Sequence, residues 1–377
     1  MSQRDHSIDV MRGTLLVLMT MTHLPTVWSG VFGEPLGFIS AAEGFVFLSA
    51  FMAGKVFTQY QLDVGIHHAS RWIRQRALRL YAIHMILLLI AFTAIAWVAS
   101  HYQRPALQNL LDFYFQAPRK AMLTGAMLIY QPPLQDILPM YILFCVGTSY
   151  VMNAAHRWGW SRVICVSAAV WLAAQFGLRR AIYSFVFENA GWNIPYGALG
   201  SFDLYAWQFL WVLGLWFGAL GFGKTREVLA SSRGMLNTAL AVSCAIFIWR
   251  HYSGPMGFQS LAMHLLWIDK WSLSAVRLVN LVALVFLIVG FGAQIKGHVR
   301  VPWLATLGRA SLWVFAAHIV SVLVVLALID TDAAPLGGWR GVFFVGFAYA
   351  ILTFTALIYR ARRKRPGTSL PASTTIA

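Results

Sequence analysis

Three ionisable residues share one face of the first long apolar segment, RDHSIDVMRGTLLVLMTMTHLP: Asp9, Arg12 and His23. Arg12 and His23 are about three helical turns apart, so their side chains point in nearly the same direction, and Asp9 precedes Arg12 by one turn. A charged group inside a bilayer costs about 2.5–3.5 kcal/mol, and groups kept there usually have a function. Neutral imidazole is the best general base for a hydroxyl near neutral pH. We therefore expect His23 to act as a base, against the alternative of a packed histidine bonded to a neighbouring helix.

Further polar side chains interrupt other apolar segments. Glu43 lies in FISAAEGFVFLSAF, among small residues, and could orient His23 as the acid of a triad does, or form a helix–helix hydrogen bond. The segment QPPLQDILPMY offers Gln135, Asp136 and Tyr141, which can face a polar substrate. These residue types favour a site for a polar substrate.

Two later segments carry similar candidates. Trp207 and Gln208 in LYAWQFLWVLG place an aromatic ring beside an amide, which suits a sugar, although a Trp at the membrane interface is equally compatible. Arg277 in DKWSLSAVRLVN could hold a carboxylate, or extend to the interface. His318 in GRASLWVFAAHIV is a second membrane histidine, either structural or facing the substrate.

Composition indicates the elements that must position these residues. The 377-residue chain is 59% hydrophobic and 11% charged, whereas soluble domains carry roughly 25% charged residues. The net charge of +16 could suggest nucleic-acid binding. The charges lie between apolar segments, however, and form no soluble basic domain, so we expect no nucleic-acid partner. No Cys or His set has metal-ligand spacing, and no metal is expected.

The apolar runs predict an all-α integral membrane protein with about ten transmembrane helices. With the N-terminus in the cytoplasm, 20 of the 29 Lys and Arg residues fall on inner segments, and the C-terminus is cytoplasmic as well. Residues 1–365 form one polytopic domain, and 366–377 form a disordered cytoplasmic tail. The connections 101–133, 179–203 and 251–275 are expected to build an outer cavity. The predicted spans are 9–30, 37–57, 79–100, 134–154, 162–178, 204–222, 236–250, 276–294, 304–329 and 339–360.

Six segments in order resemble one family. RDHSIDVMRG followed by THLP resembles the first helix of the OpgC family, within the acyltransferase-three superfamily, whose members show a basic residue, ten intervening residues and a histidine. Arg12 and His23 match that pattern. The segments SAAEGFVFLSAF, QPPLQDILPMY, LYAWQFLWVLG, DKWSLSAVRL and GRASLWVFAAH resemble further family segments. The resemblance covers nearly the whole chain.

The resemblance implies O-acyl transfer in the bacterial inner membrane, from cytoplasmic acyl-CoA to an acceptor on the periplasmic side. In OpgC relatives the acyl group is succinyl and the acceptor a periplasmic glucan; acetyl-CoA is the alternative donor. Arg12 and Asp9 would line the opening of the donor channel. The CoA phosphates would bind basic side chains of the inner loops, namely Arg71, Arg74, Arg76, Arg79, Lys296 and Arg300.

A different class of protein remains open. Buried Asp, Glu, Arg and His residues among ten spans also suit a proton-coupled secondary transporter. A transporter of this kind would show interrupted helices at matching positions in two halves, and we find none in the sequence. A scaffold without chemistry is disfavoured by the cost of the buried charges. The oligomeric state does not follow from the sequence.

Overall fold

The computed structural model describes residues 6–229, 233–253, 267–295, 301–329 and 335–364. These residues form helices and no strand, and a single parallel bridge joins Thr26 to Leu336. The all-α fold is therefore as predicted. The predicted tail, 366–377, lies outside the described residues, as does most of the predicted outer connection 251–275.

Seven described helical segments are long and apolar enough to cross a membrane, which makes this a multi-pass membrane protein. A bent pair, α10 (Trp160–Gln175) with Leu178–Glu188, turns through 80° and could supply an eighth span. The seven segments are α3 (Ala41–Val64), α4 with its continuation (Ile66–His101), α9 (Ile137–Trp158), Tyr196–Gly221 with most of α12 (Leu204–Leu229), Ala275–Gly292 of α15 (Ala275–Ile295), α17 (Ser311–Leu328) and Gly338–Arg363 of α18 (Gly338–Lys364).

Each of the ten predicted ranges contains helix, but ten complete spans stay a prediction. Helix α1 (His6–His23) is not among the seven, because Asp9, Arg12 and His23 lower its hydropathy. Helix α13 (Arg233–Ile248) has only 16 residues. The predicted range 304–329 holds two helices, α16 (Pro302–Arg309) and α17, which meet at Ala310.

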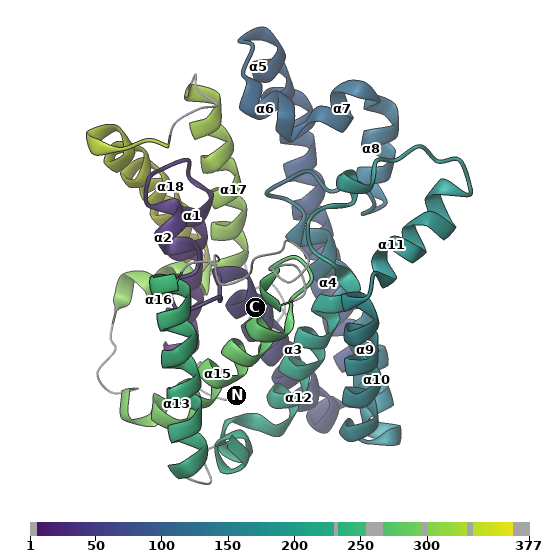
Figure 1. The fold of residues 1–377 in the computed structure, drawn as a ribbon, viewed down its shortest axis with the longest axis vertical. Coiled ribbons are helices and arrows are strands. Elements are labelled where there is room, and N and C mark those ends of the chain that lie inside the picture. The colour runs from purple at the N-terminus through teal and green to yellow at the C-terminus, as the bar shows by residue number, and fades with distance from the viewer. Residues whose placement is uncertain (1–5, 230–232, 254–266, 296–300, 330–334, 365–377) are drawn as a thin grey trace.

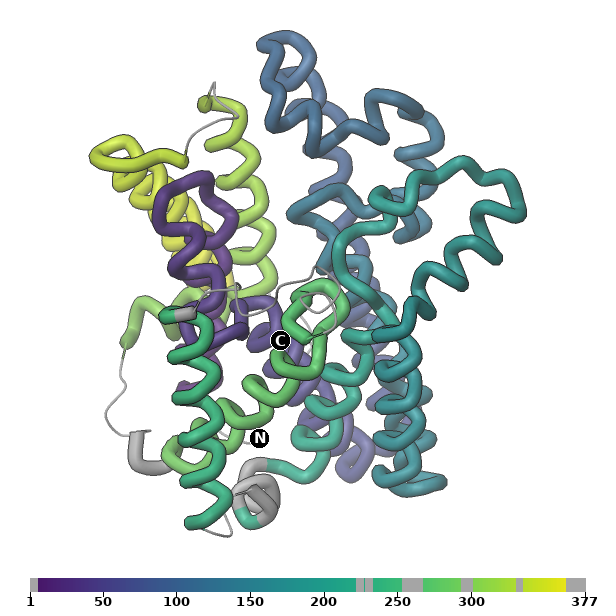
Figure 2. Tube along the Cα trace, in the orientation of Figure 1, coloured from purple at the N-terminus to yellow at the C-terminus, as the bar shows by residue number. Residues whose placement is uncertain are grey.

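The two ends of the bundle differ in the way that the sequence predicts. The short helices α5 (Ala96–His101), α6 (Pro105–Leu110), α7 (Asp112–Gln116) and α8 (Pro118–Ala126) gather at one end, at the top of Figure 1. Helix α11 (Leu178–Tyr183) turns away from α10 toward the same end, as the tube in Figure 2 shows. The predicted outer segments 101–133 and 179–203 thus share one end, and the membrane orientation itself stays a prediction.

Close backbone contacts fix the helices that carry the polar residues. Helix α1 packs along α16, and α3 packs along α12. A Cβ at Gly308 would lie 1.8 Å from the Asp9 carbonyl oxygen, and a Cβ at Gly218 would lie 2.0 Å from that of Phe51. Only glycine permits such approach, as at small-residue contacts between membrane helices generally. At this point no methyl group therefore fits between α1 and α16.

A short backbone latch joins the segment after α1 to the segment after α17. The Leu336 amide donates to the Pro25 carbonyl at 2.8 Å, and the Val27 amide donates to the Leu336 carbonyl at 3.1 Å. Helices α1 and α17 also pack directly against each other. The latch holds the end of α1 next to α17, where the two membrane histidines lie.

Candidate active site

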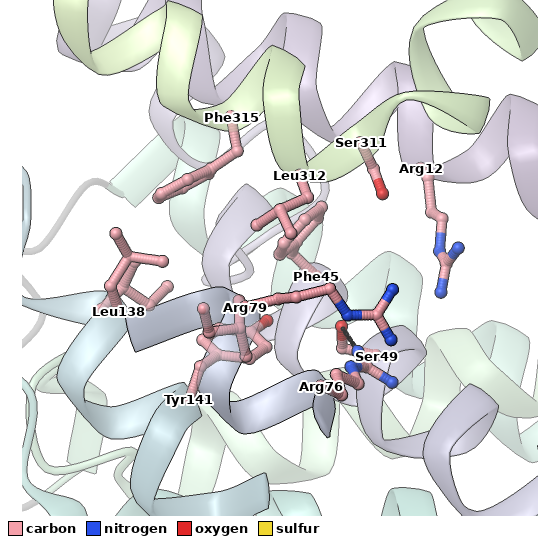
Figure 3. A pocket seen from close by; sticks show the side chains of 12 residues that line it. Arg12, Phe45, Ser49, Arg76, Arg79, Leu138, Tyr141, Ser311, Leu312 and Phe315 are labelled. Carbon is pink, nitrogen blue, oxygen red and sulfur yellow. Dashed lines mark hydrogen bonds between the residues drawn. The ribbon is translucent and has the colours of Figure 1, made fainter. Parts of the chain in front are cut away.

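One cavity, called the inner cavity because the predicted orientation places it toward the cytoplasm, gathers three arginines from two helices. Arg12 comes from α1, and Arg76 and Arg79 come from α4, and their guanidinium groups occupy one side of the cavity while Leu138 and Phe315 lie on the other (Figure 3). Arg76 donates to the Ser49 hydroxyl at 3.0 Å. No acidic side chain is among the described residues that line this cavity. Its polar side is therefore built for an anion.

Only some of the predicted phosphate-binding residues line the inner cavity. Arg76 and Arg79 line it, whereas Arg71 and Arg74 lie nearer the start of α4 and are exposed. Lys296 and Arg300 lie outside the described residues. Asp9, predicted at the channel opening, is buried and forms an ion pair with Arg309 at 3.4 Å.

A second cavity, called the outer cavity because the predicted orientation places it toward the periplasm, is lined by His23. Its charged and polar lining comes from five places in the chain: the end of α1, the start of α3, the residues before α9, those before α12 and the turn before α15. It offers hydroxyl groups, a carboxylate, an ammonium and an indole around one imidazole. The lining residues that we use below are His23, Ser40, Asp136, Ser201, Lys270 and Trp271.

The two cavities lie back to back. Ile137 and Phe315 line both of them, so these two side chains lie between the cavities. We call the two side chains together the partition. Arg12 and His23 lie one on each side, and eleven residues of helix separate their Cα atoms by about 16 Å along the axis. The face of α1 that the sequence singles out thus runs from the arginine-lined cavity to the cavity that contains His23.

His23 contacts a second histidine. Its Nδ1 lies 2.9 Å from Nε2 of His318, and the two rings stack with centroids 5.1 Å apart. The other ring nitrogen of His318, Nδ1, lies 3.2 Å from the Phe315 carbonyl oxygen. His318 is fully buried. The contact with His23 favours the structural alternative for His318 over a direct contact with the substrate.

Lys270 brings a positive charge into the outer cavity. No described carboxylate lies within 4 Å of its ammonium, which sits 5.1 Å from the centroid of the Trp271 ring. Burial lowers the pKa of Lys270 from its ordinary value, although the negative charge of Glu43 acts in the opposite direction. An incompletely compensated ammonium in a cavity favours an anionic ligand.

The turn that carries Lys270 is held in place by hydrogen bonds. The Ser272 amide donates to the Asp269 carboxylate at 2.7 Å, and the Trp207 indole donates to the Trp271 carbonyl at 3.0 Å. The Trp171 indole donates to the Leu273 carbonyl at 3.0 Å. Such a turn presents Lys270 and Trp271 in one arrangement.

The family comparison agrees with this geometry. The chain matches the model of the family described as OpgC protein over residues 4–364. The chain belongs to the OpgC family. No curated protein and no solved structure matches it. Membership indicates a membrane acyltransferase in general.

Two predicted site residues of this OpgC protein form a structural ion pair. The Arg277 guanidinium donates to Glu43 at 2.8 Å and to Glu34 at 2.5 Å, and the Arg277 side chain is 1% exposed. Glu43 also accepts the Ser40 amide as part of a capping box at the start of α3. Arg277 is therefore not available for a substrate carboxylate. The partner of Glu43 is Arg277, and Glu43 does not orient His23. Burial raises the pKa of Glu34, but Arg277 and Arg250 outweigh it and hold that pKa below its ordinary value.

Most of the predicted substrate-facing residues do not line the outer cavity. Trp207 is fully buried, and Gln208 exchanges hydrogen bonds with Ser167. Gln135 is fully buried against the Leu87 carbonyl, and Tyr141 lines the inner cavity.

Asp136 alone of this predicted set lines the outer cavity, where its carboxylate accepts the Ser201 amide at 3.1 Å. Sequence reasoning missed Trp271, which the segment DKW places beside Lys270. A charge next to an aromatic residue just before an apolar span was the available signal.

Proposed function

We propose that this OpgC protein transfers an acyl group, succinyl, from cytoplasmic acyl-CoA to a hydroxyl group of a periplasmic glucan or other saccharide, in the bacterial inner membrane. One observation carries the proposal. An arginine-lined cavity and a histidine-containing cavity meet at a partition of two apolar side chains. A reaction whose donor and acceptor stay on opposite sides of a membrane needs this arrangement.

The inner cavity suits the donor. Guanidinium groups bind phosphate through charge-assisted, often paired hydrogen bonds, and Arg76 and Arg79 stand beside Arg12 with no acid among the described lining residues. About 16 Å of helix separates Arg12 from His23. A donor anchored by phosphates must therefore carry its reactive group on a long, thin arm, as the pantetheine arm of CoA does. The arm would pass between Ile137 and Phe315.

The outer cavity suits the acceptor. Trp271 offers an apolar indole face for the carbon–hydrogen face of a sugar ring, and its side chain is 44% exposed. Asp136 and Ser201 can exchange hydrogen bonds with hydroxyl groups. The succinyl group carries a free carboxylate. Lys270 binds this carboxylate, in place of Arg277, which the sequence suggests for that role.

The chemical step uses His23 as general base. A ring nitrogen of His23 takes the proton of an acceptor hydroxyl while the hydroxyl oxygen attacks the thioester carbonyl carbon. The carbon–sulfur bond then breaks, and the departing sulfur receives the proton from His23. The products are an ester and a free thiol. A positioned base of this kind contributes about 10²–10⁴-fold to the rate.

The test follows free-thiol release by purified protein with acetyl-CoA and succinyl-CoA in parallel, with and without a periplasmic glucan extract. We expect release that requires the glucan and is lost in His23→Ala, with folding retained. The variant Arg76→Ala should raise the KM for the donor, and the matched variant Arg74→Ala, on the exposed part of the same helix, should not. Unchanged release by His23→Ala would contradict the proposal.

A secondary transporter is the rival function, because two opposed cavities with a thin partition also suit alternating access. The same samples discriminate between the two. Movement of a solute by the protein reconstituted in vesicles, without any thiol release and without binding of acyl-CoA, would favour the transporter.

A further inference from the structure

The two membrane histidines are joined by a hydrogen bond, and the surroundings decide which ring donates and which accepts. We infer that His318 is a positioning residue that sets the tautomer of His23, so that Nε2 of His23 is the nitrogen that accepts the substrate proton. The inference rests on the proposed function, in which His23 is the base. It adds which nitrogen reacts and why that nitrogen carries no proton.

The direction starts at a backbone carbonyl, which can only accept. The Phe315 oxygen lies 3.2 Å from Nδ1 of His318, so this nitrogen carries the hydrogen. A neutral imidazole has one N–H, which leaves Nε2 of His318 as an acceptor. That nitrogen lies 2.9 Å from Nδ1 of His23, which therefore donates. Nε2 of His23 is then left with its lone pair.

The reverse order is unfavourable. If Nε2 of His318 carried the hydrogen and donated to His23, its Nδ1 lone pair would face the lone pairs of the Phe315 oxygen at 3.2 Å. His318 is fully buried, so water cannot compensate for this repulsion. Nε2 of His23 would also carry a hydrogen and could not accept one from a hydroxyl.

The remaining ring nitrogen of His23 is Nε2. No described residue donates to or accepts from Nε2 of His23, and the residue lines the outer cavity. The two rings are stacked within 27° of parallel, and the latch between Pro25 and Leu336 holds their helices together. The pair is therefore fixed before any substrate enters.

The pair also accommodates the charge that forms in the reaction. When Nε2 takes the substrate proton, His23 becomes an imidazolium whose Nδ1–H still donates to His318. No proton needs to pass to His318, and the hydrogen bond strengthens because its donor is now charged. A neutral histidine thus does here what a buried carboxylate does in a Ser-His-Asp triad.

The first test compares two substitutions of His318. In His318→Met the acceptor for Nδ1–H of His23 is lost, and we expect kcat to fall within the range of about 10²–10⁴-fold that a positioned base supplies, with the donor KM unchanged. In His318→Gln the amide oxygen can replace Nε2 as the acceptor, so most of kcat should return. Equal losses in both variants, or a normal kcat in His318→Met, would overturn the inference.

The second test reads the tautomers without any activity. Nitrogen-15 spectra of the histidine-labelled protein, with His23→Asn and His318→Gln to identify the signals, report which ring nitrogen carries hydrogen. We expect Nδ1–H on both rings, and Nε2–H on His23 would overturn the inference. If the spectra agree but no acyl transfer is found, the proposed function fails and the order of the histidine pair stands.

Discussion

Replacement of Arg277 by Met should destabilise the protein strongly. Its guanidinium donates to Glu43 at 2.8 Å, and its side chain and that of Glu43 are 1% and 0% exposed. Without Arg277, the Glu43 carboxylate stays buried with only the hydrogen bonds of the capping box. Removal of one partner from a buried ion pair costs about 3–5 kcal/mol, and Glu34 keeps Arg250 as a partner, so we expect a loss in that range.

Denaturant unfolding in detergent measures this loss of unfolding free energy. The matched control is Arg180→Met, because Arg180 and Glu188 form an ion pair with side chains 57% and 42% exposed. Exposed pairs contribute at most about 1 kcal/mol. The double variant Arg277→Met with Glu43→Gln should recover part of the loss, since no buried charge is then left alone. Wild-type stability of Arg277→Met, together with a raised KM for a succinyl donor, would refute the reasoning and return Arg277 to the substrate.

Three further predictions concern the cavities and the helices around them. Lys270→Met should raise the KM for succinyl-CoA about tenfold or more and leave acetyl-CoA unchanged, because a hydrogen bond to a charged group contributes about 1.5–3 kcal/mol; equal effects on both donors would contradict this role. Because the pKa of Lys270 is lowered by burial, the KM for the succinyl donor should rise with pH at a lower pH than for an ordinary lysine, and Lys270→Arg should remove that rise. Gly308→Ala should lower thermal stability and donor turnover, since its Cβ would overlap the Asp9 carbonyl, whereas Gly147→Ala on α9, which has open space, should change neither.

Local sequence patterns were sufficient for the helices and for one face of one helix. Apolar runs of membrane length locate helix in every predicted span, and helical periodicity alone aligns Arg12 with His23. The structure adds that the two residues open into different cavities. The position of a residue along a helix axis follows from its residue number. The partition depends on how α9 and α17 pack, which residue number does not give.

Pairing between distant residues could not be predicted in the same way. For Glu43 the sequence leaves open whether it orients His23 or bonds to another helix, and its partner is Arg277, 234 residues away in sequence. His318 is 295 residues from His23. Residue types state that such groups need partners, and only the packing of helices decides which partner each receives.

Loop conformation accounts for the remaining difference. Trp207 has the ring expected of a surface that stacks on a sugar, yet it is buried. Its indole donates to the turn that exposes Trp271. A turn fixed by backbone hydrogen bonds leaves no regular period in the sequence. Aromatic residues on either side of such a turn therefore cannot be sorted into supporting and exposed ones before the structure is known.

The partition of Ile137 and Phe315 also bears on the electrical insulation of the membrane. Two polar cavities that enter from opposite ends would form a water-filled pore if nothing separated them. An apolar constriction interrupts the file of water molecules, and with it the conduction of protons and small ions. In the proposed reaction, a donor arm that displaces Phe315 would fill the same gap with its own atoms, so acyl transfer would not open a water-filled path for ions.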